Sequence, residues 1–448
     1  MTGGDGARPD PAGQGLLRTT LLVLPFQVIF RVGEGLLPLV LAAWFGRSAA
    51  TDAYYLASAV FVFVGTLVVL AFQDSALVPV LTEVDHREPA EFPRVAGAIF
   101  AHAVAASALL AAFVGMGTMA WFFVRGSAAE RELVGPLVLG FGTMLMLSAC
   151  RSFLVGLAHV RRFFRIHPVA SGAGMVATLT LLALAKERFG VVAIPWSLAA
   201  GEAVAAVLVA GFLRLQGVVF DPTFTRGPAF VRFVRLVASE VVGSAVTRVN
   251  PVVDQGMARI AGVPGGGTIL RYVFDVALVP TSLVSASLFP VLVSDLSRAR
   301  AAGDQKAFVR AVTRSTVGVV LVLTLVSAAM FLFRRPLLEV LFLRGLMDPG
   351  AVARMVDVFP YALVGVAPFG ALLVLARAHV ALQNTAILVP MGVFNAASNA
   401  VLNLALVGPL GIEGLALATS LMHTLVAAAF AVLFVRRVRA FGDPKAVL

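Results

Sequence analysis

The sequence predicts an all-α polytopic membrane protein with about 12 transmembrane helices in two pseudo-symmetric six-helix lobes. Three observations lead to this fold class. Of the 448 residues, 59% are hydrophobic and only 13% are charged, which is the composition of an integral membrane protein. Apolar stretches long enough to cross a hydrocarbon layer of ~30 Å recur along the whole chain. Short strings from the first half also return in the same order in the second half.

The apolar stretches divide the chain into spans separated by short polar loops. We place the spans at residues 16–46, 52–83, 95–124, 133–160, 166–186, 191–214, 232–261, 267–295, 308–333, 352–380, 386–408 and 411–437. The first six spans form a predicted N-terminal lobe, residues 16–220, and the others a C-terminal lobe, residues 221–440. Residues 1–15, rich in Gly, Pro and Asp, and residues 441–448 are predicted cytoplasmic tails, the first of them disordered.

An internal repeat supports the division into two lobes. Leu77 to Leu81 at the end of span two recurs as Leu288 to Leu292 in span eight, and Ala158-His159-Val160 recurs as Ala378-His379-Val380. Six spans per copy is an even number, so both copies have the same orientation and are related by an axis along the membrane normal. We therefore expect two lobes that face each other across a cleft, a geometry suited to transport by alternating access.

The basic residues indicate topology and do not suggest a nucleic-acid partner. The net charge is +11, but the Lys and Arg residues fall in short loops between apolar spans. About twenty lie on one side of the membrane and eleven on the other, an imbalance that orients both termini to the cytoplasm. The sequence holds no phosphate-cradling loop, His/Cys metal cluster or nucleophile motif, so we expect neither an enzyme nor a cofactor.

Charged residues inside the apolar spans are the first candidates for a substrate site. Arg31 and Glu34 lie in the middle of span one, where a lone charge costs roughly 2.5 to above 10 kcal/mol and normally faces protein or a watery cavity. One interpretation is that the two residues, three apart on one helical face, only neutralise each other. The other is that the helix lines a polar chamber and offers Arg31 to an anionic ligand.

Other charged residues within spans extend this candidate set. Asp74 and Asp275 lie in the repeat-related spans two and eight, where they are expected to point into the cleft and either carry a proton or pair with Arg31 or Arg248. Arg248 and Arg151 also lie inside spans, seven and four. For Arg151 the alternative is a structural pair with a carboxylate or a position at a lobe interface. Prolines in spans one, two, seven and eight make these helices the candidates for a moving gate.

Several strings resemble the MurJ/MviN lipid II flippase family of the MOP superfamily, which also contains the MATE exporters. They are Ala50 to Tyr55, Ser75 to Leu81, Ala376 to Thr385, and Asn403 to Leu406 followed by Gly411 and Gly414 to Thr419. The resemblance implies a flippase of the bacterial cytoplasmic membrane. It would move a lipid-linked pyrophosphate glycan precursor, similar to lipid II, from one leaflet to the other. The expected partners are this precursor and membrane lipids, and we expect a monomer.

The arginine clamp of that family is only partly present here. The family is thought to hold the pyrophosphate on arginines of helices one, two and eight, and a planar guanidinium suits phosphate oxygens. Arg31 matches the first of these positions, whereas the others fall near Leu37, Gly65 and Thr66, and Asp275. Arg248 and Arg151 are our candidates to rebuild part of the clamp on other helices.

A sodium site of the same family matches this sequence better. Some members bind Na⁺ with an Asp in helix seven, two amide or carboxyl side chains in helix eleven, and a Thr and a backbone carbonyl in helix twelve. The corresponding residues here are Asp254, Asn399, Asn403, Leu415 and Thr419. Asn403 replaces an acid, so the same residues are also compatible with a simple hydrogen-bond network between helices. Na⁺ or H⁺ is the expected coupling ion.

Two alternatives to the lipid flippase stay open. In a cation-coupled, MATE-like exporter of amphipathic small molecules, Asp74, Asp275 and Asp254 would carry the coupling and Arg31 would be structural. In a scaffold that kept the fold and lost transport, the missing arginines would reflect the loss. The resembled flippases commonly have two further helices after the twelfth, whereas here Arg436 and Arg437 precede a short polar tail.

Overall fold

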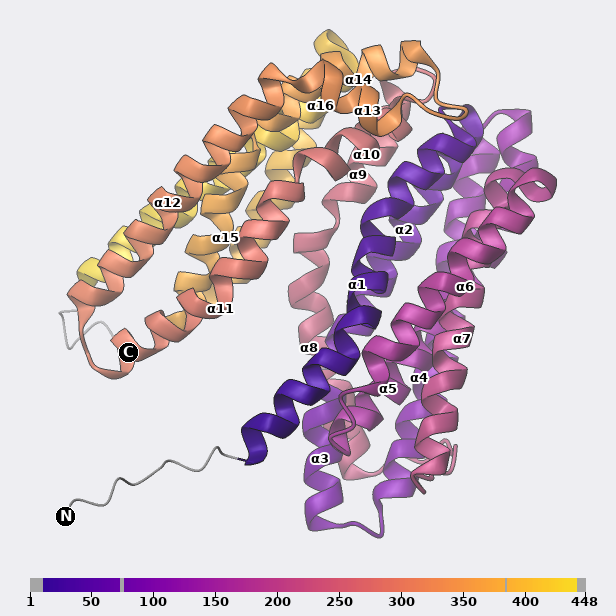
Figure 1. Cartoon of the computed structure of the whole chain (residues 1–448), viewed down its shortest axis with the longest axis vertical. Helices are drawn as coiled ribbons and strands as arrows, with labels where there is room; N and C mark the ends of the chain where they lie inside the picture. Colours follow the sequence, from indigo (N-terminus) through magenta and orange to yellow (C-terminus); the bar gives the residue numbers. More distant parts are fainter. Residues whose placement is uncertain (1–10, 73–75, 383–384, 441–448) are drawn as a thin grey trace, which may run out of the picture. The chain divides into compact units, whose positions relative to one another are not determined.

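The computed structural model describes residues 11–72, 76–382 and 385–440, and these residues form helices and connecting loops without any strand. The chain divides into two compact units (Figure 1). Unit 1 contains residues up to Leu37 and Val64–Glu240, and unit 2 contains Pro38–Phe63 and Val241–Leu448. The chain therefore passes from one unit to the other three times.

The helices of the first half of the chain are long and mostly apolar. They are α1 (Pro11–Phe45), α2 (Ala49–Phe72), α3 (Val78–Arg87), α4 (Phe92–Arg125), α5 (Ala128–Val160), α6 (Ile166–Phe189), the 3₁₀ helix η2 (Gly190–Val192), α7 (Ala193–Leu215) and α8 (Pro228–Arg248). Within unit 1, α5 packs on α4 and α7, and α6 packs on α7. The first helix begins at Pro11, inside the predicted tail 1–15, whose residues 1–10 lie outside the described part of the chain.

The second half contains several short helices that follow one another with brief breaks, and it ends in the long helical segment α16. They are α9 (Asn250–Ile260), α10 (Gly266–Ala277), α11 (Val279–Ala301), α12 (Gln305–Leu332), α13 (Arg334–Phe342), α14 (Pro349–Leu363), α15 (Val366–Ala381), the 3₁₀ helix η3 (Thr385–Ile387) and α16 (Leu388–Ala440). Within unit 2, α15 packs against α11, α12 and α16, and α9 packs against α16. The predicted tail 441–448 lies outside the described residues.

These helices confirm an all-α membrane protein. Eight helical segments of the described chain are long and apolar enough to cross a membrane, or nine if the bent pair α14 and α15 is counted as one span. Predicted spans two, seven, eight and ten each contain two consecutive helices, and α16 covers spans eleven and twelve. Gly411 separates these last two spans with a φ of 61°, a left-handed conformation that favours glycine. The observed helices are thus compatible with twelve spans.

Helix starts follow from local capping chemistry. Ser127 and Glu130 form a capping box at the start of α5, where each side chain accepts a hydrogen bond from the backbone N–H of the other. Asp304 caps α12 by accepting from the N–H of Ala307 at 2.8 Å, and Asp348 caps α14 by accepting from the N–H of Ala351 at 2.8 Å. Each cap gives a backbone donor at the helix start a partner.

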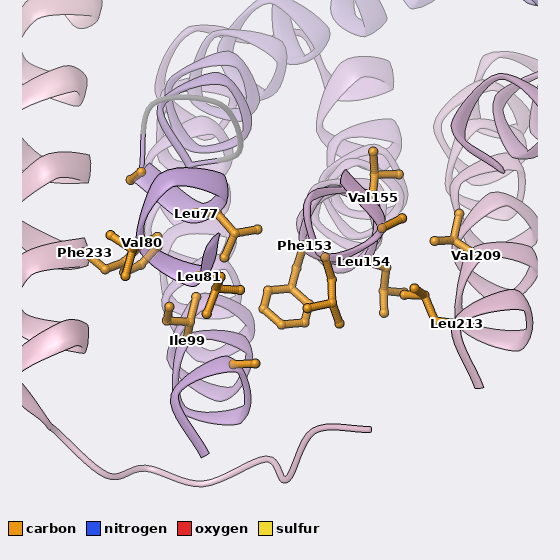
Figure 2. Close-up of a cluster of buried hydrophobic side chains, with 14 of the residues drawn as sticks. Leu77, Val80, Leu81, Ile99, Phe153, Leu154, Val155, Val209, Leu213 and Phe233 are labelled. Atoms are coloured by element: carbon orange, nitrogen blue, oxygen red, sulfur yellow. The ribbon is translucent and has the colours of Figure 1, made fainter. Parts of the chain in front are cut away.

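A buried hydrophobic cluster joins α3, α4, α5, α6, α7 and α8 within unit 1. Figure 2 shows the Phe153 ring of α5 pointing toward Leu81 and Ile99, while Phe233 of α8 lies beside Val80. Phe153, Leu81 and Ile99 have no exposed surface. Because a close-packed core tolerates little rearrangement, this cluster holds the six helices as one body.

The C-terminal part of α1 and the N-terminal part of α2, residues 38–63, group with unit 2, whereas the sequence analysis placed the N-terminal lobe at residues 16–220. Asp52 of α2 accepts hydrogen bonds from the backbone N–H of Gly265 at 2.8 Å and from the N–H and hydroxyl of Thr268 at 2.9 and 2.8 Å. The N–H of Leu346 donates to the carbonyl oxygen of Ala43 at 2.7 Å. Residues 38–63 are thus bound to α10 and to the loop that precedes α14.

Candidate functional site

The predicted cation ligands come together where α9 packs against α16. Asp254 of α9 accepts hydrogen bonds on one carboxylate oxygen, Oδ1, from the Nδ2 atoms of Asn399 at 2.8 Å and Asn403 at 2.7 Å. Thr419 donates from its hydroxyl to the carbonyl oxygen of Leu415 at 3.2 Å, and its side chain also interacts with Asp254. All five residues lie in unit 2, on two helices that contact each other.

Buried amide oxygens make this constellation suitable for a hard cation. Among the described residues, the Oδ1 atoms of Asn399 and Asn403 are buried without a hydrogen-bond partner, and both side chains have 0% exposure. A buried acceptor without a donor normally costs ~1–3 kcal/mol. A bound cation would give these two oxygens a partner. With the Asp254 carboxylate and the Leu415 carbonyl, they form the kind of oxygen set that a hard cation prefers. The residues therefore fit Na⁺.

A second amide pair extends this constellation by one helical turn. Asn250 donates from Nδ2 to Oδ1 of Asn395 at 3.0 Å, while the Oδ1 atom of Asn250 is buried and has no partner in the described part of the chain. Sequence reasoning missed both residues. The available signal was spacing, because Asn395, Asn399 and Asn403 recur every four residues and so share one helix face.

Arg31 and Glu34 form the expected pair on α1. Nη1 of Arg31 lies 3.0 Å from Oε2 of Glu34, and the two side chains are 78% and 45% exposed. The pair sits in an otherwise apolar helix, with Val28–Phe45 as a candidate membrane span. An ion pair this exposed leaves most donors of the guanidinium available to a ligand.

Asp275 pairs with Arg271, an arginine of predicted span eight that the sequence analysis left out of the candidate set. Nε of Arg271 lies 3.0 Å from Oδ1 of Asp275, four residues further along α10. Three tyrosines, Tyr54, Tyr55 and Tyr272, surround this pair, with ring centroids of Tyr55 and Tyr272 5.6 Å apart. Arg271 thus lies one helical turn from the position where the resembled family has its helix-eight arginine.

The remaining predicted substrate residues have different surroundings. Arg151 of α5 forms a two-point pair with Glu202 of α7, with Nε 2.5 Å from Oε2 and Nη2 3.3 Å from Oε1. This is the structural alternative for Arg151, and we assign it no substrate contact. Arg248 ends α8, is exposed, and forms no ion pair with the residues that the structure describes. Asp74 lies outside the described residues.

One family model matches most of the chain, and solved structures share its fold. A family model described as lipid II flippase MurJ matches residues 41–447. No curated protein matches the chain.

Solved structures supply the fold. A lipid II flippase MurJ in an inward closed conformation is 15% identical, with a TM-score of 0.75 over 94% of this chain and 87% of its own. An inward-facing multidrug resistance MATE family transporter of the MOP superfamily is 14% identical, with a TM-score of 0.75 over 93% of this chain and 96% of its own. The Vibrio cholerae MATE transporter VcmN in the bent form is 14% identical, with a TM-score of 0.59 over 96% and 97%. At these identities the likeness establishes the fold alone, a MATE/MurJ-like arrangement of membrane helices.

Proposed function

The chain belongs to the MurJ family of lipid II flippases, and from this premise we propose that it moves a lipid-linked pyrophosphate glycan precursor, similar to lipid II, across the bacterial cytoplasmic membrane by alternating access. The family consists of membrane transporters and not of enzymes. The precursor enters from the cytoplasmic leaflet and leaves on the other side. Both termini face the cytoplasm, and the transporter works as a monomer.

This proposal rests mainly on the exposure of the Arg31 guanidinium. Arg31 lies within an apolar span, yet its side chain is 78% exposed. Placing an exposed arginine in hydrocarbon costs several kcal/mol, so such a side chain faces a hydrated path. Glu34 holds it through one oxygen contact at 3.0 Å, which leaves the other N–H donors for phosphate oxygens. We therefore propose that Arg31 is the first residue to bind the pyrophosphate.

Arg271 is the second arginine that we propose meets the pyrophosphate during the cycle. Its side chain is 47% exposed although it belongs to a candidate span, Gly266–Ser285. The pair with Asp275 at 3.0 Å keeps the guanidinium oriented, and an anionic substrate competes with this carboxylate for the same donors. Arg271 thus replaces the helix-eight arginine of the family one turn away from its usual position.

Coupling to a cation is the third part of the proposal. Na⁺ binds between Asp254 and the side-chain oxygens of Asn399, Asn403 and Thr419, with the carbonyl oxygen of Leu415. The two Asn side chains turn their Oδ1 atoms toward the ion, which resolves the unpartnered buried oxygens. A neutral Asn403 leaves Asp254 as the one negative ligand, so the ion is bound weakly enough to be released in each cycle.

Complementation in cells depleted of their lipid II flippase tests the substrate. The wild-type chain is expected to restore growth, and Arg31→Ala to abolish it at equal membrane abundance. Arg94→Ala is the matched control, because Arg94 forms the same kind of exposed pair with Glu91, three residues away, at 3.4 Å. Growth of the Arg31→Ala strain like that of the wild type would contradict the role of this arginine.

A MATE-like exporter of amphipathic small molecules is the second candidate. The observation that favours it is the Asp254 constellation together with an equally good structural match to a MATE family transporter. In this case, drug efflux would be lost in Asp254→Asn, and flippase-depleted cells would not be rescued. A chain that fails both assays at normal expression has kept the fold and lost transport.

A further inference from the structure

We propose that Asn250 and Asn395 form an access position for the coupling cation, one helical turn before the Asp254 position. The inference rests on the proposed cation binding at Asp254 and adds the path by which the ion reaches it. The two positions repeat the same geometry, because Asn250 faces Asn395 and, four residues later on both helices, Asp254 faces Asn399. The helices α9 and α16 therefore advance in the same direction along this contact.

An unsatisfied oxygen marks the access position. Asn250 is only 9% exposed, and within the described residues its Oδ1 atom is buried without a hydrogen-bond partner. Its Nδ2 atom already donates to Asn395 at 3.0 Å, so the pair is held in place while one acceptor stays open. Asn250, Asn399 and Asn403 thus present three such oxygens along the same contact.

A backbone carbonyl beside Asn250 lacks its usual helical donor. Helix α8 ends at Arg248 and α9 begins at Asn250, so the helix is interrupted at Val249. Pro251 has no N–H and cannot donate to the carbonyl oxygen of Thr247, which would be its partner in an unbroken helix. Irregular backbone at membrane depth is tolerated where protein or a watery cavity can satisfy it. A passing cation is one such partner.

The exposed fractions of the four asparagines indicate the end from which the cation enters. Asn395 is half-buried, Asn250 is 9% exposed, and Asn399 and Asn403 have no exposed surface. Water therefore reaches the Asn395 end and completes the coordination shell of an ion that has too few protein ligands there. Four residues of helix separate the two positions by ~6 Å, and two cations at this distance repel each other. The positions are consequently occupied in turn, which makes the amide pair a step in loading and release.

Exchange of radioactive Na⁺ on the purified full-length protein tests this inference. Bound label is measured at equilibrium and then during displacement by excess unlabelled Na⁺. Asn250→Ala and Asn395→Ala are expected to keep bound label but to exchange it about fivefold more slowly, since each loses one contact to the ion in transit. Ser398→Ala is the matched control, because Ser398 is a half-buried polar residue of α16 outside the Asn395, Asn399 and Asn403 face.

A second variant separates ion access from structural packing. Asn395→Asp keeps the acceptor for Nδ2 of Asn250 and adds negative charge, so it is expected to exchange Na⁺ at least as fast as the wild type, whereas alanine slows it. Wild-type exchange in both alanine variants, with label lost in Asp254→Asn, overturns the access position and leaves the proposed site intact. If the wild type holds no displaceable Na⁺, the Asp254 site is refuted and the access position with it.

Discussion

Replacement of Asp52 tests the link between α2 and α10 described above. The Asp52 carboxylate accepts three hydrogen bonds of 2.8–2.9 Å from Gly265 and Thr268. These donors include backbone N–H groups at the start of α10, so Asp52 caps a helix that is more than 200 residues away in sequence. Asp52→Ala leaves the donors without partners and removes a favourable charge from the helix N-terminus.

The magnitude follows from the donors that are lost. A hydrogen bond to a charged group contributes ~1.5–3 kcal/mol, and losing a helix cap costs ~0.5–2 kcal/mol. Since the three bonds share one carboxylate and are not additive, we expect Asp52→Ala to lower the free energy of unfolding by about 2–4 kcal/mol. Asp304→Ala is the matched control, because Asp304 makes a single local cap bond to Ala307 on an exposed helix end, worth about 1 kcal/mol.

Unfolding by sodium dodecyl sulfate in mixed micelles, followed by circular dichroism, measures both variants against the wild type. Asp52→Asn keeps one acceptor oxygen and is expected to fall between the wild type and Asp52→Ala. The reasoning is refuted if Asp52→Ala costs no more than Asp304→Ala, because the long-range cap would then contribute nothing beyond a local one.

Three further predictions use the same unfolding measurement or Na⁺ binding. Arg151→Ala is expected to cost about 2–4 kcal/mol because it strands Glu202, and the double replacement Arg151→Met with Glu202→Leu is expected to recover most of this loss. Gly345→Ala is expected to cost at least about 3 kcal/mol, since a Cβ atom at a φ of 62° meets a backbone carbonyl oxygen. Gly303→Ala, with a φ of 68° and open space around it, should cost only about 1 kcal/mol; equal costs would contradict the steric argument. Asn403→Asp restores a second acid and is expected to bind Na⁺ at least about tenfold more tightly, and unchanged affinity would contradict Na⁺ binding there.

The fold and the grouping of the candidate cation ligands were predictable because apolar stretches and residue spacing can be recognised within short segments of the sequence. Apolar stretches of about 20 residues need only composition to be recognised as spans. Asn399 and Asn403 are four residues apart and therefore share a helix face, and the resemblance to a family supplied Asp254 as the partner. The structure places the Nδ2 atoms of Asn399 and Asn403 at 2.8 and 2.7 Å from the same carboxylate oxygen of Asp254.

Other features depend on contacts between distant segments and have no local signature. Glu202 lies 51 residues from Arg151, and no periodicity connects the two. Sequence reasoning counted Arg271, near the start of predicted span eight, only as a topology signal, whereas the structure pairs it with Asp275 on α10. The short helix α13 (Arg334–Phe342) was missed because its charged start resembles a loop.

The division of the chain into two units passes through the interior of helices. Helices α1, α2 and α8 each start in one unit and finish in the other, with changes between residues 37 and 38, 63 and 64, and 240 and 241. A movement of one unit relative to the other therefore has to bend α1, α2 and α8, because the chain crosses between the units inside these helices and not in loops. Pro38 lies at the unit boundary in α1. Because proline has no backbone N–H, the helix bends there at a lower energy cost. Helix α8 ends at Arg248, two residues before Asn250, so the amide pair proposed as an access position lies next to the end of one of these three helices.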